Sequence, residues 1–110
     1  MVIMCAVGMN VDDYQDDRFE WHLAKAASNL REHKVSFEVA RLAFDDPLAL
    51  DDMLVEDSDD EDRSKWVGLA NGRLLVVIYT DRTGDDGVTR IRVISAWKAN
   101  KHDQAQYIRG

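Results

Sequence analysis

The spacing of apolar residues changes early in the chain. At residues 19–21 apolar and polar side chains alternate, which is typical of a short strand with one buried face. From residue 23 to residue 33 apolar side chains recur at helical spacing, which predicts an amphipathic helix. The expected apolar face of this helix consists of Leu23, Ala26, Ala27 and Leu30.

A second helix is expected directly after the first. Ser36 is a suitable N-cap, because its hydroxyl can accept a hydrogen bond from a backbone N–H of the first helical turn. Phe37, Ala40 and Phe44 follow at helical spacing and share one face. Pro47 disfavours helical geometry in the residue before it, so the helix should end there.

The second half of the chain has the pattern of a three-stranded antiparallel meander. Asn71 and Gly72 tolerate the positive φ of a tight hairpin turn, and the segments around them are rich in β-branched residues. A longer loop over residues 81–87 precedes the third strand. The three strands are expected at residues 66–69, 73–80 and 88–96.

These elements place the chain in the α+β class. Residues 48–55 are a further strand candidate, and residues 98–108, which lack proline and glycine, predict a C-terminal helix. The expected architecture is an antiparallel sheet with two N-terminal helices and the C-terminal helix on one side. Residues 1–18 show little pattern in their acidic half. We therefore expect an acidic N-terminal extension and a single domain over residues 19–110.

The net charge of −7 at first argues against nucleic-acid binding, because phosphate contacts need clustered lysine and arginine. The acidic residues, however, are concentrated in two segments. Residues 1–17 carry a charge of −4 and residues 45–63 a charge of −9, which leaves +6 for the remainder. The net charge therefore does not exclude a nucleic-acid partner.

The acidic residues 56–62 do not match a calcium-binding loop. Counted from Asp57, the sixth EF-hand position is Asp62 instead of glycine, and the twelfth is Gly68 instead of glutamate. We expect a solvated loop and no metal site. Weak cation binding and contact with a basic partner segment are the alternatives.

Cysteine content and hydropathy bear on where the protein works. Cys5 is the only cysteine, so the chain cannot form an internal disulfide or a four-cysteine zinc site. No apolar run approaches the roughly 18 residues of a membrane span, and the apolar start lacks the basic region of a signal peptide. We therefore expect a cytoplasmic protein without membrane contacts.

Four blocks of sequence resemble the BrnT family of toxins. They are EWHLAKAASNLREHKVSFE at residues 20–38, FDDPLAL at 44–50, GRLLVVIYT at 72–80 and IRVISAWKA at 91–99. Because the blocks occur in the family's order, the resemblance is more specific than any single short motif. It covers roughly residues 19–108.

The resemblance implies a RelE-like ribonuclease that belongs to a type II toxin–antitoxin system and inhibits translation. It also implies neutralisation by a BrnA-like antitoxin in a hetero-oligomer. The antitoxin would supply the DNA-binding part, so that operator DNA is contacted only through it. RNA is the expected substrate.

Three departures from the family pattern stand out. His22 and Leu23 stand at the start of the first helix where the family usually has Asp-Pro, which removes a helix cap. Lys34 stands where the family prefers glycine after the first helix, a position that often needs left-handed geometry. Trp97 replaces the arginine of the family's SARKA block. The alternative to an active ribonuclease is therefore a relative that has lost catalysis and only pairs with an antitoxin-like partner.

RNA cleavage without metal uses the 2′-hydroxyl of the RNA as nucleophile and needs a base, an acid and cations. It requires no cofactor. The candidate catalytic residues are Arg63, Arg82, Lys98 and Tyr107. The candidate RNA-binding residues are Arg90, Arg92, Lys101 and Trp97.

Several of these candidates have two interpretations. Strand alternation puts Arg90 and Arg92 on one sheet face, where they either grip adjacent phosphates or are simply solvated. Trp97 either stacks on an RNA base or covers the edge of the core. Tyr107 either transfers a proton or packs its ring on the sheet.

The histidines are weaker candidates for catalysis. His22 and His33 lie at the start and end of the first helix, and His33 is expected to meet the negative end of the helix dipole. His102 is either a proton-transfer group or a surface residue of the last helix.

Overall fold

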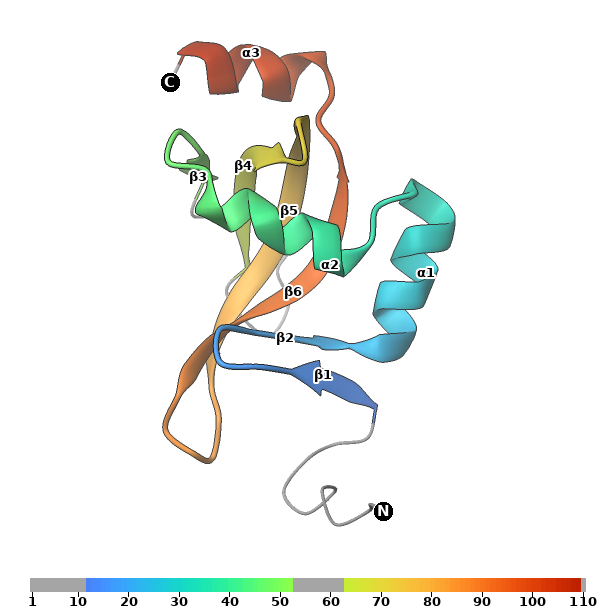
Figure 1. The fold of residues 1–110 in the computed structure, drawn as a ribbon. Coiled ribbons are helices and arrows are strands. Elements are labelled where there is room, and N and C mark those ends of the chain that lie inside the picture. The colour runs from blue at the N-terminus through green and yellow to red at the C-terminus, as the bar shows by residue number, and fades with distance from the viewer. Residues whose placement is uncertain (1–11, 53–62, 110) are drawn as a thin grey trace.

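The computed structural model describes residues 12–52 and 63–109. In this part of the chain six strands form one sheet in the order β1-β2-β6-β5-β4-β3 (Figure 1). The strands are β1 (Asp13–Gln15), β2 (Phe19–His22), β3 (Leu50–Asp52), β4 (Ser64–Ala70), β5 (Arg73–Thr83) and β6 (Thr89–Lys98). The helices are α1 (Leu23–His33), α2 (Phe37–Ala40), the 3-10 helix η2 (Arg41–Asp45) and α3 (Lys101–Arg109). The predicted α+β class is confirmed.

The meander of β4, β5 and β6 is present as predicted. Asn71 and Gly72 have φ angles of 52° and 78°, which form the tight turn between β4 and β5. Ser36 accepts a hydrogen bond from the backbone N–H of Val39 at 3.1 Å, which confirms it as a helix N-cap. Lys34 ends α1 with a φ of 61°, so a lysine adopts the left-handed geometry there.

The prediction of a purely antiparallel sheet is wrong. β2 runs parallel to β6, with Phe19 opposite Ile91 and Glu20 opposite Arg92. A strand of four residues carries no signal for a partner that lies about seventy positions away, because pairing of that kind is decided by tertiary packing. The sheet is therefore mixed, and β6 lies between a parallel and an antiparallel neighbour.

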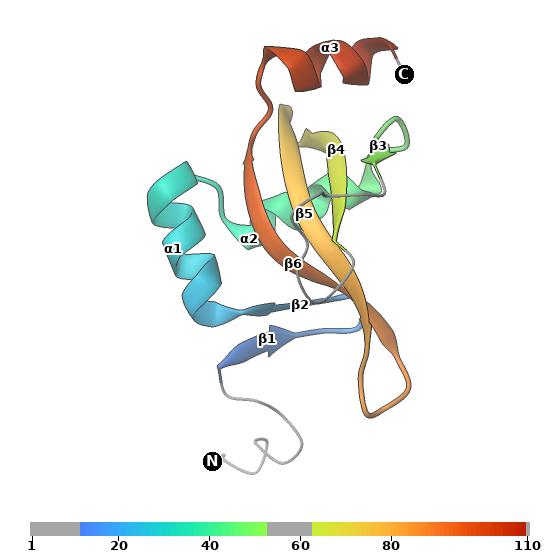
Figure 2. The same ribbon diagram turned by 180° about the vertical axis from the view of Figure 1, so that it is seen from behind.

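The helices do not all lie on one side of the sheet, as the sequence had suggested. The α1, α2 and η2 segments cover one face and enclose the larger core, to which Trp21, Phe37 and Val77 contribute. Tyr107 of α3 packs instead against Val76 and its neighbours on the other face. Figure 2 shows α3 at one end of the molecule, apart from the other helices.

Several boundaries differ from those predicted. The expected second helix is divided into the short α2 and the 3-10 helix η2. The α3 helix begins at Lys101, because Lys98 still belongs to β6. Leu23 and Leu30 are about half exposed, so the predicted apolar face of α1 is largely uncovered, and its one buried residue is Asn29.

Part of the expected N-terminal extension belongs to the sheet. Residues 13–15 form β1, which pairs antiparallel with β2. Residues 1–11 lie outside the described part of the chain. The strand candidate at residues 48–55 is found as β3, while its residues 53–55 and the acidic residues 56–62 also lie outside the described part.

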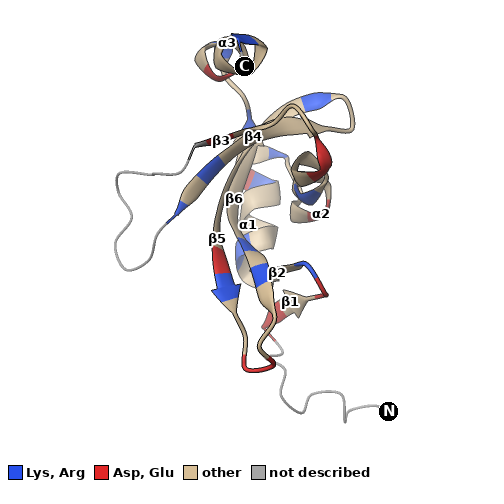
Figure 3. Ribbon diagram, turned by 90° about the vertical axis from the view of Figure 1, so that its left-hand side faces the viewer, with Lys and Arg blue, Asp and Glu red and all other residues tan. Residues whose placement is uncertain are grey.

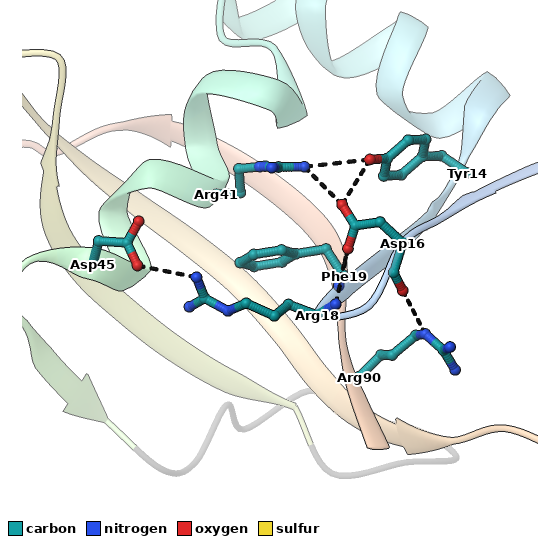
Figure 4. A network of polar contacts seen from close by, with 7 residues as sticks. All are labelled: Tyr14, Asp16, Arg18, Phe19, Arg41, Asp45 and Arg90. Atoms are coloured by element: carbon teal, nitrogen blue, oxygen red, sulfur yellow. Dashed lines mark hydrogen bonds and ion pairs between the residues drawn. The ribbon is translucent and has the colours of Figure 1, made fainter. Parts of the chain in front are cut away.

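Asp16 ties the turn between β1 and β2 to two other elements (Figure 4). Its carboxylate accepts hydrogen bonds of 2.6 to 2.9 Å from Tyr14 Oη, Arg41 Nη1 and the backbone N–H groups of Arg18 and Phe19. Its backbone oxygen accepts a hydrogen bond of 2.6 Å from Arg90 Nε. One acidic residue therefore connects the N-terminal hairpin to η2 and β6.

No helix within residues 12–52 and 63–109 is long and apolar enough to cross a membrane.

Candidate functional site

Arg90 and Arg92 lie on the sheet face opposite α1 and α2. The residues between and beyond them, Ile91 and Val93, belong to the larger core, as strand alternation requires. Arg90 is only 7% exposed, and its two terminal nitrogens bind the carboxylate of Asp86 at 3.2 and 2.9 Å. Arg90 therefore does not present the exposed guanidinium for phosphate binding that the sequence suggested.

The other arginines of this face are paired as well. Arg92 Nη1 donates to Glu20 Oε2 at 2.9 Å and lies 3.6 Å from Asp13 Oδ2. Arg82, which is more exposed, lies 3.8 Å from the same oxygen of Glu20. Sequence reasoning missed Glu20, because only the parallel pairing of β2 with β6 brings it opposite Arg92.

The arginine face is electrostatically unfavourable for a polyanion. Asp13, Glu20, Asp85 and Asp86 line the same hollow as Arg82 and Arg90, and Figure 3 shows acidic residues at the tip of the β5–β6 loop. The hydrogen bonds from Arg90 lower the pKa of Asp86 to about 2, so this carboxylate is ionised at neutral pH. The charge of the arginines is therefore balanced within the protein.

The opposite end of β6 is organised differently. The pairing of β2 reaches only Ile91 and Arg92, so no strand among residues 12–52 and 63–109 pairs with the later part of β6 on that side. Asn29 of α1 takes this place, because its side chain donates to Ala96 O at 2.8 Å and accepts from Ala96 N at 3.1 Å. Its amide also donates to Val35 O at 2.9 Å. These contacts fix the last turn of α1 beside the end of β6.

Trp97 and His33 meet at this junction. Their ring centroids are 5.9 Å apart, with an angle of 45° between the planes. Trp97 packs one side against the apolar cluster around Val76 and remains partly exposed, while His33 is exposed. Glu32, His33, Trp97 and Lys98 together line an open hollow of about 580 Å³. Both interpretations of Trp97 are thus compatible with the structure, because the ring contacts the core and is also partly exposed to solvent.

The side chains of this hollow match the needs of RNA chemistry. Aromatic rings stack on unpaired bases, and a lysine can neutralise a phosphate. A histidine and a carboxylate can accept or donate protons. Sequence reasoning placed His33 only at the end of a helix, because no local pattern indicates that it lies beside a residue 64 positions later.

A second groove begins on the other side of Lys98. It lies between the β4–β5 hairpin and α3 and is lined by Leu69, Arg73, Lys98, Tyr107 and Ile108 among others. Tyr107 donates a hydrogen bond of 2.6 Å to Asp46 Oδ2, which, together with burial, raises the pKa of Tyr107. The tyrosine is therefore protonated at neutral pH and holds α3 to the loop after η2. Lys98 links the two hollows because it lines both.

A comparison with family models gives a match over residues 21–103 to the ribonuclease toxin, BrnT, of type II toxin–antitoxin systems. The chain belongs to the BrnT family. The match includes the Trp97 hollow but not β1 or the last residues of α3. No curated protein matches the chain.

The remaining candidates of this BrnT chain are scattered. Arg63 precedes β4, and its buried Nε has no hydrogen-bond partner among the described residues. Lys101 and His102 are exposed at the start of α3. No group of three metal-binding side chains comes together within residues 12–52 and 63–109.

Proposed function

We propose that this BrnT protein is an endoribonuclease that cleaves RNA without a metal ion, and that the Trp97 hollow is its active surface. The observation that carries the proposal is the placement of His33, Trp97 and Lys98 around one open hollow. The arginine face is a poorer candidate, because its cations are paired with carboxylates of the same chain. RNA is bound where unpaired basic and aromatic side chains meet.

Each residue of the hollow has a specific part in this proposal. An RNA base stacks on Trp97, and Lys98 neutralises the phosphate next to it. Glu32 accepts the proton of the 2′-hydroxyl, whose oxygen attacks the phosphorus. His33 donates a proton to the departing 5′-oxygen, so that the products are a 2′,3′-cyclic phosphate and a free 5′-hydroxyl. Tyr107 positions α3 and does not transfer a proton.

The biological consequence we propose is inhibition of translation in the cytoplasm. Type II toxins have a protein antitoxin, and the family match supports one here. A BrnA-like antitoxin would neutralise the enzyme within a hetero-oligomer and would make all contacts with operator DNA. The toxin domain would include β1 as well as residues 19–110, because β1 pairs with β2.

The proposal is tested with purified protein and single-stranded RNA in the presence of excess EDTA. We expect cleavage products that end in a cyclic phosphate, and loss of cleavage in His33→Ala. An exposed residue elsewhere on α1, changed as Lys25→Ala, is the matched control and should retain activity. Intact RNA at confirmed folding of the wild-type protein would contradict the proposal.

A binding-only relative is the second candidate, and one observation favours it. Trp97 stands where the family pattern has an arginine, so a cation close to the phosphate is missing. In that case the wild-type chain binds the antitoxin without cleaving RNA. Trp97→Arg separates the two candidates, because an arginine can stack its guanidinium plane on a base as the tryptophan does and also adds the missing cation. It should raise an existing activity modestly but should create none if other groups are also missing.

A further inference from the structure

Three exposed apolar side chains gather around the tether between Asp46 and Tyr107. Leu48 is 70% exposed, Leu69 is 43% exposed and Ile108 is 81% exposed. The backbone N–H groups of Leu48 and Leu69 both donate to the Asp46 carboxylate, at 2.9 and 2.8 Å. Tyr107 binds the same carboxylate, and Ile108 follows it in α3. Three hydrogen bonds to one carboxylate therefore hold the segments that carry these side chains close together.

The surface continues into a groove with a basic rim. Leu69 and Ile108 line the groove together with Arg73 and Lys98, and none of its described lining residues is acidic. The nearby Asp103 is directed elsewhere, because Lys65 Nζ binds it at 3.0 Å and its side chain is almost fully buried. The groove therefore favours a partner that carries both apolar and acidic side chains.

Protein is a better match to this groove than RNA. RNA presents mostly phosphates, sugars and flat bases, whereas Leu48, Leu69 and Ile108 gain from contact with other aliphatic side chains. An amphipathic segment with one apolar and one acidic face satisfies both features of the groove. Exposed apolar residues clustered with a polar rim are typical of protein interaction sites.

We propose that the groove between α3 and the β4–β5 hairpin binds an acidic, amphipathic segment of the antitoxin. Because Lys98 lines both this groove and the Trp97 hollow, a segment in the groove covers a cation that RNA needs. Antitoxin and RNA then exclude one another. This inference rests on the proposed function, from which it takes the identity of the partner and the place of the RNA.

The test measures the affinity of the purified protein for the product of the gene adjacent to its own, expressed as the candidate antitoxin. We expect Ile108→Asp and Leu69→Asp each to weaken antitoxin binding roughly tenfold or more, because acidic side chains at the centre of an apolar contact are poorly tolerated. Val88→Asp is the matched control, since Val88 is 40% exposed and lies in the β5–β6 loop at the other end of the molecule. The control should bind as the wild type does.

A competition experiment gives the second half of the test. Antitoxin should displace a fluorescent single-stranded RNA from the wild-type protein, and the free Ile108→Asp variant should bind that RNA with unchanged affinity. Circular dichroism establishes that each variant is folded.

Several results would overturn the proposal. One is wild-type antitoxin affinity in both the Ile108→Asp and the Leu69→Asp variant. Another is loss of antitoxin binding in Leu30→Asp instead, which would place the partner on α1. A third is RNA that stays bound in the antitoxin complex. If Ile108→Asp loses affinity for RNA but keeps its affinity for the antitoxin, the groove binds RNA, and this result would also contradict the proposal. If the variants release antitoxin but the wild type never binds or cleaves RNA, the proposed function fails while the docking site stands.

Discussion

The side chain of Asn29 forms hydrogen bonds with both backbone groups of Ala96, at 2.8 and 3.1 Å, as a neighbouring strand would. The amide is 3% exposed, and Ala96 is fully buried. One residue of α1 thus satisfies the backbone of β6 at Ala96 and holds α1 so that His33 lies next to Trp97. The position of the proposed active surface depends on this contact.

Replacing Asn29 should destabilise the fold. Asn29→Ala leaves buried backbone groups of Ala96 and Val35 without partners, and we expect a loss of about 3 kcal/mol in the free energy of unfolding. Urea denaturation at neutral pH measures the change. Ser28→Ala, on the same helix, removes only an exposed hydrogen bond to Lys25 O and should be nearly neutral. Equal stabilities for the two variants would show that Asn29 is not a tertiary anchor.

Asp16 should make stability depend on pH. Burial acts to raise its pKa, but the hydrogen bonds from Tyr14, Phe19 and Arg18 and the charge of Arg41 lower it overall. A lowered pKa in the folded state means that the ionised carboxylate stabilises the fold above its unfolded pKa of about 4. This contribution is lost as the pH falls through the folded pKa. Asp16→Asn should therefore lower the Tm at pH 7 and flatten its decline below about pH 4.

The measurement for Asp16 is a series of thermal melts from neutral to acidic pH. Asp17→Asn is a suitable control, because the neighbouring Asp17 is exposed. A Tm profile for Asp16→Asn that runs parallel to that of the wild type would show that another carboxylate governs the acid transition. Since β1 is part of the sheet and Asp16 connects the following turn to η2 and β6, removal of residues 1–17 should also lower the Tm.

Arg90 should be structural. Arg90→Ala removes the contacts to Asp86 and to the backbone oxygen of Asp16, and we expect the Tm to fall by about 4 °C or more. The salt dependence of RNA affinity should stay as it is in the wild type, because no phosphate contact is lost. If Arg90→Ala keeps its stability and shows a reduced salt dependence of RNA affinity, the arginine face binds RNA.

The local elements could be predicted from the sequence, whereas the contacts that build the site could not. The Asn71–Gly72 turn, the Ser36 cap and the bounds of α1 follow from rules that act over a few residues. The parallel partner of Glu20 and the burial of Arg90 depend on pairing across the whole chain. The same holds for the meeting of His33 with Trp97. The α3 helix has too weak an apolar pattern to indicate which face of the sheet it covers.

The central claim is that RNA binds at the Trp97 hollow and not at the arginine face. The affinity of a short single-stranded RNA, made uncleavable by 2′-O-methylation, can be measured by fluorescence anisotropy at several salt concentrations. We expect Trp97→Ala to weaken binding by about tenfold or more through lost stacking. Lys98→Ala should reduce the slope of log affinity against log salt by about 0.7. Arg92→Ala should leave that slope unchanged. Wild-type affinity and slope in Trp97→Ala and Lys98→Ala, with a reduced slope in Arg92→Ala, would contradict the claim.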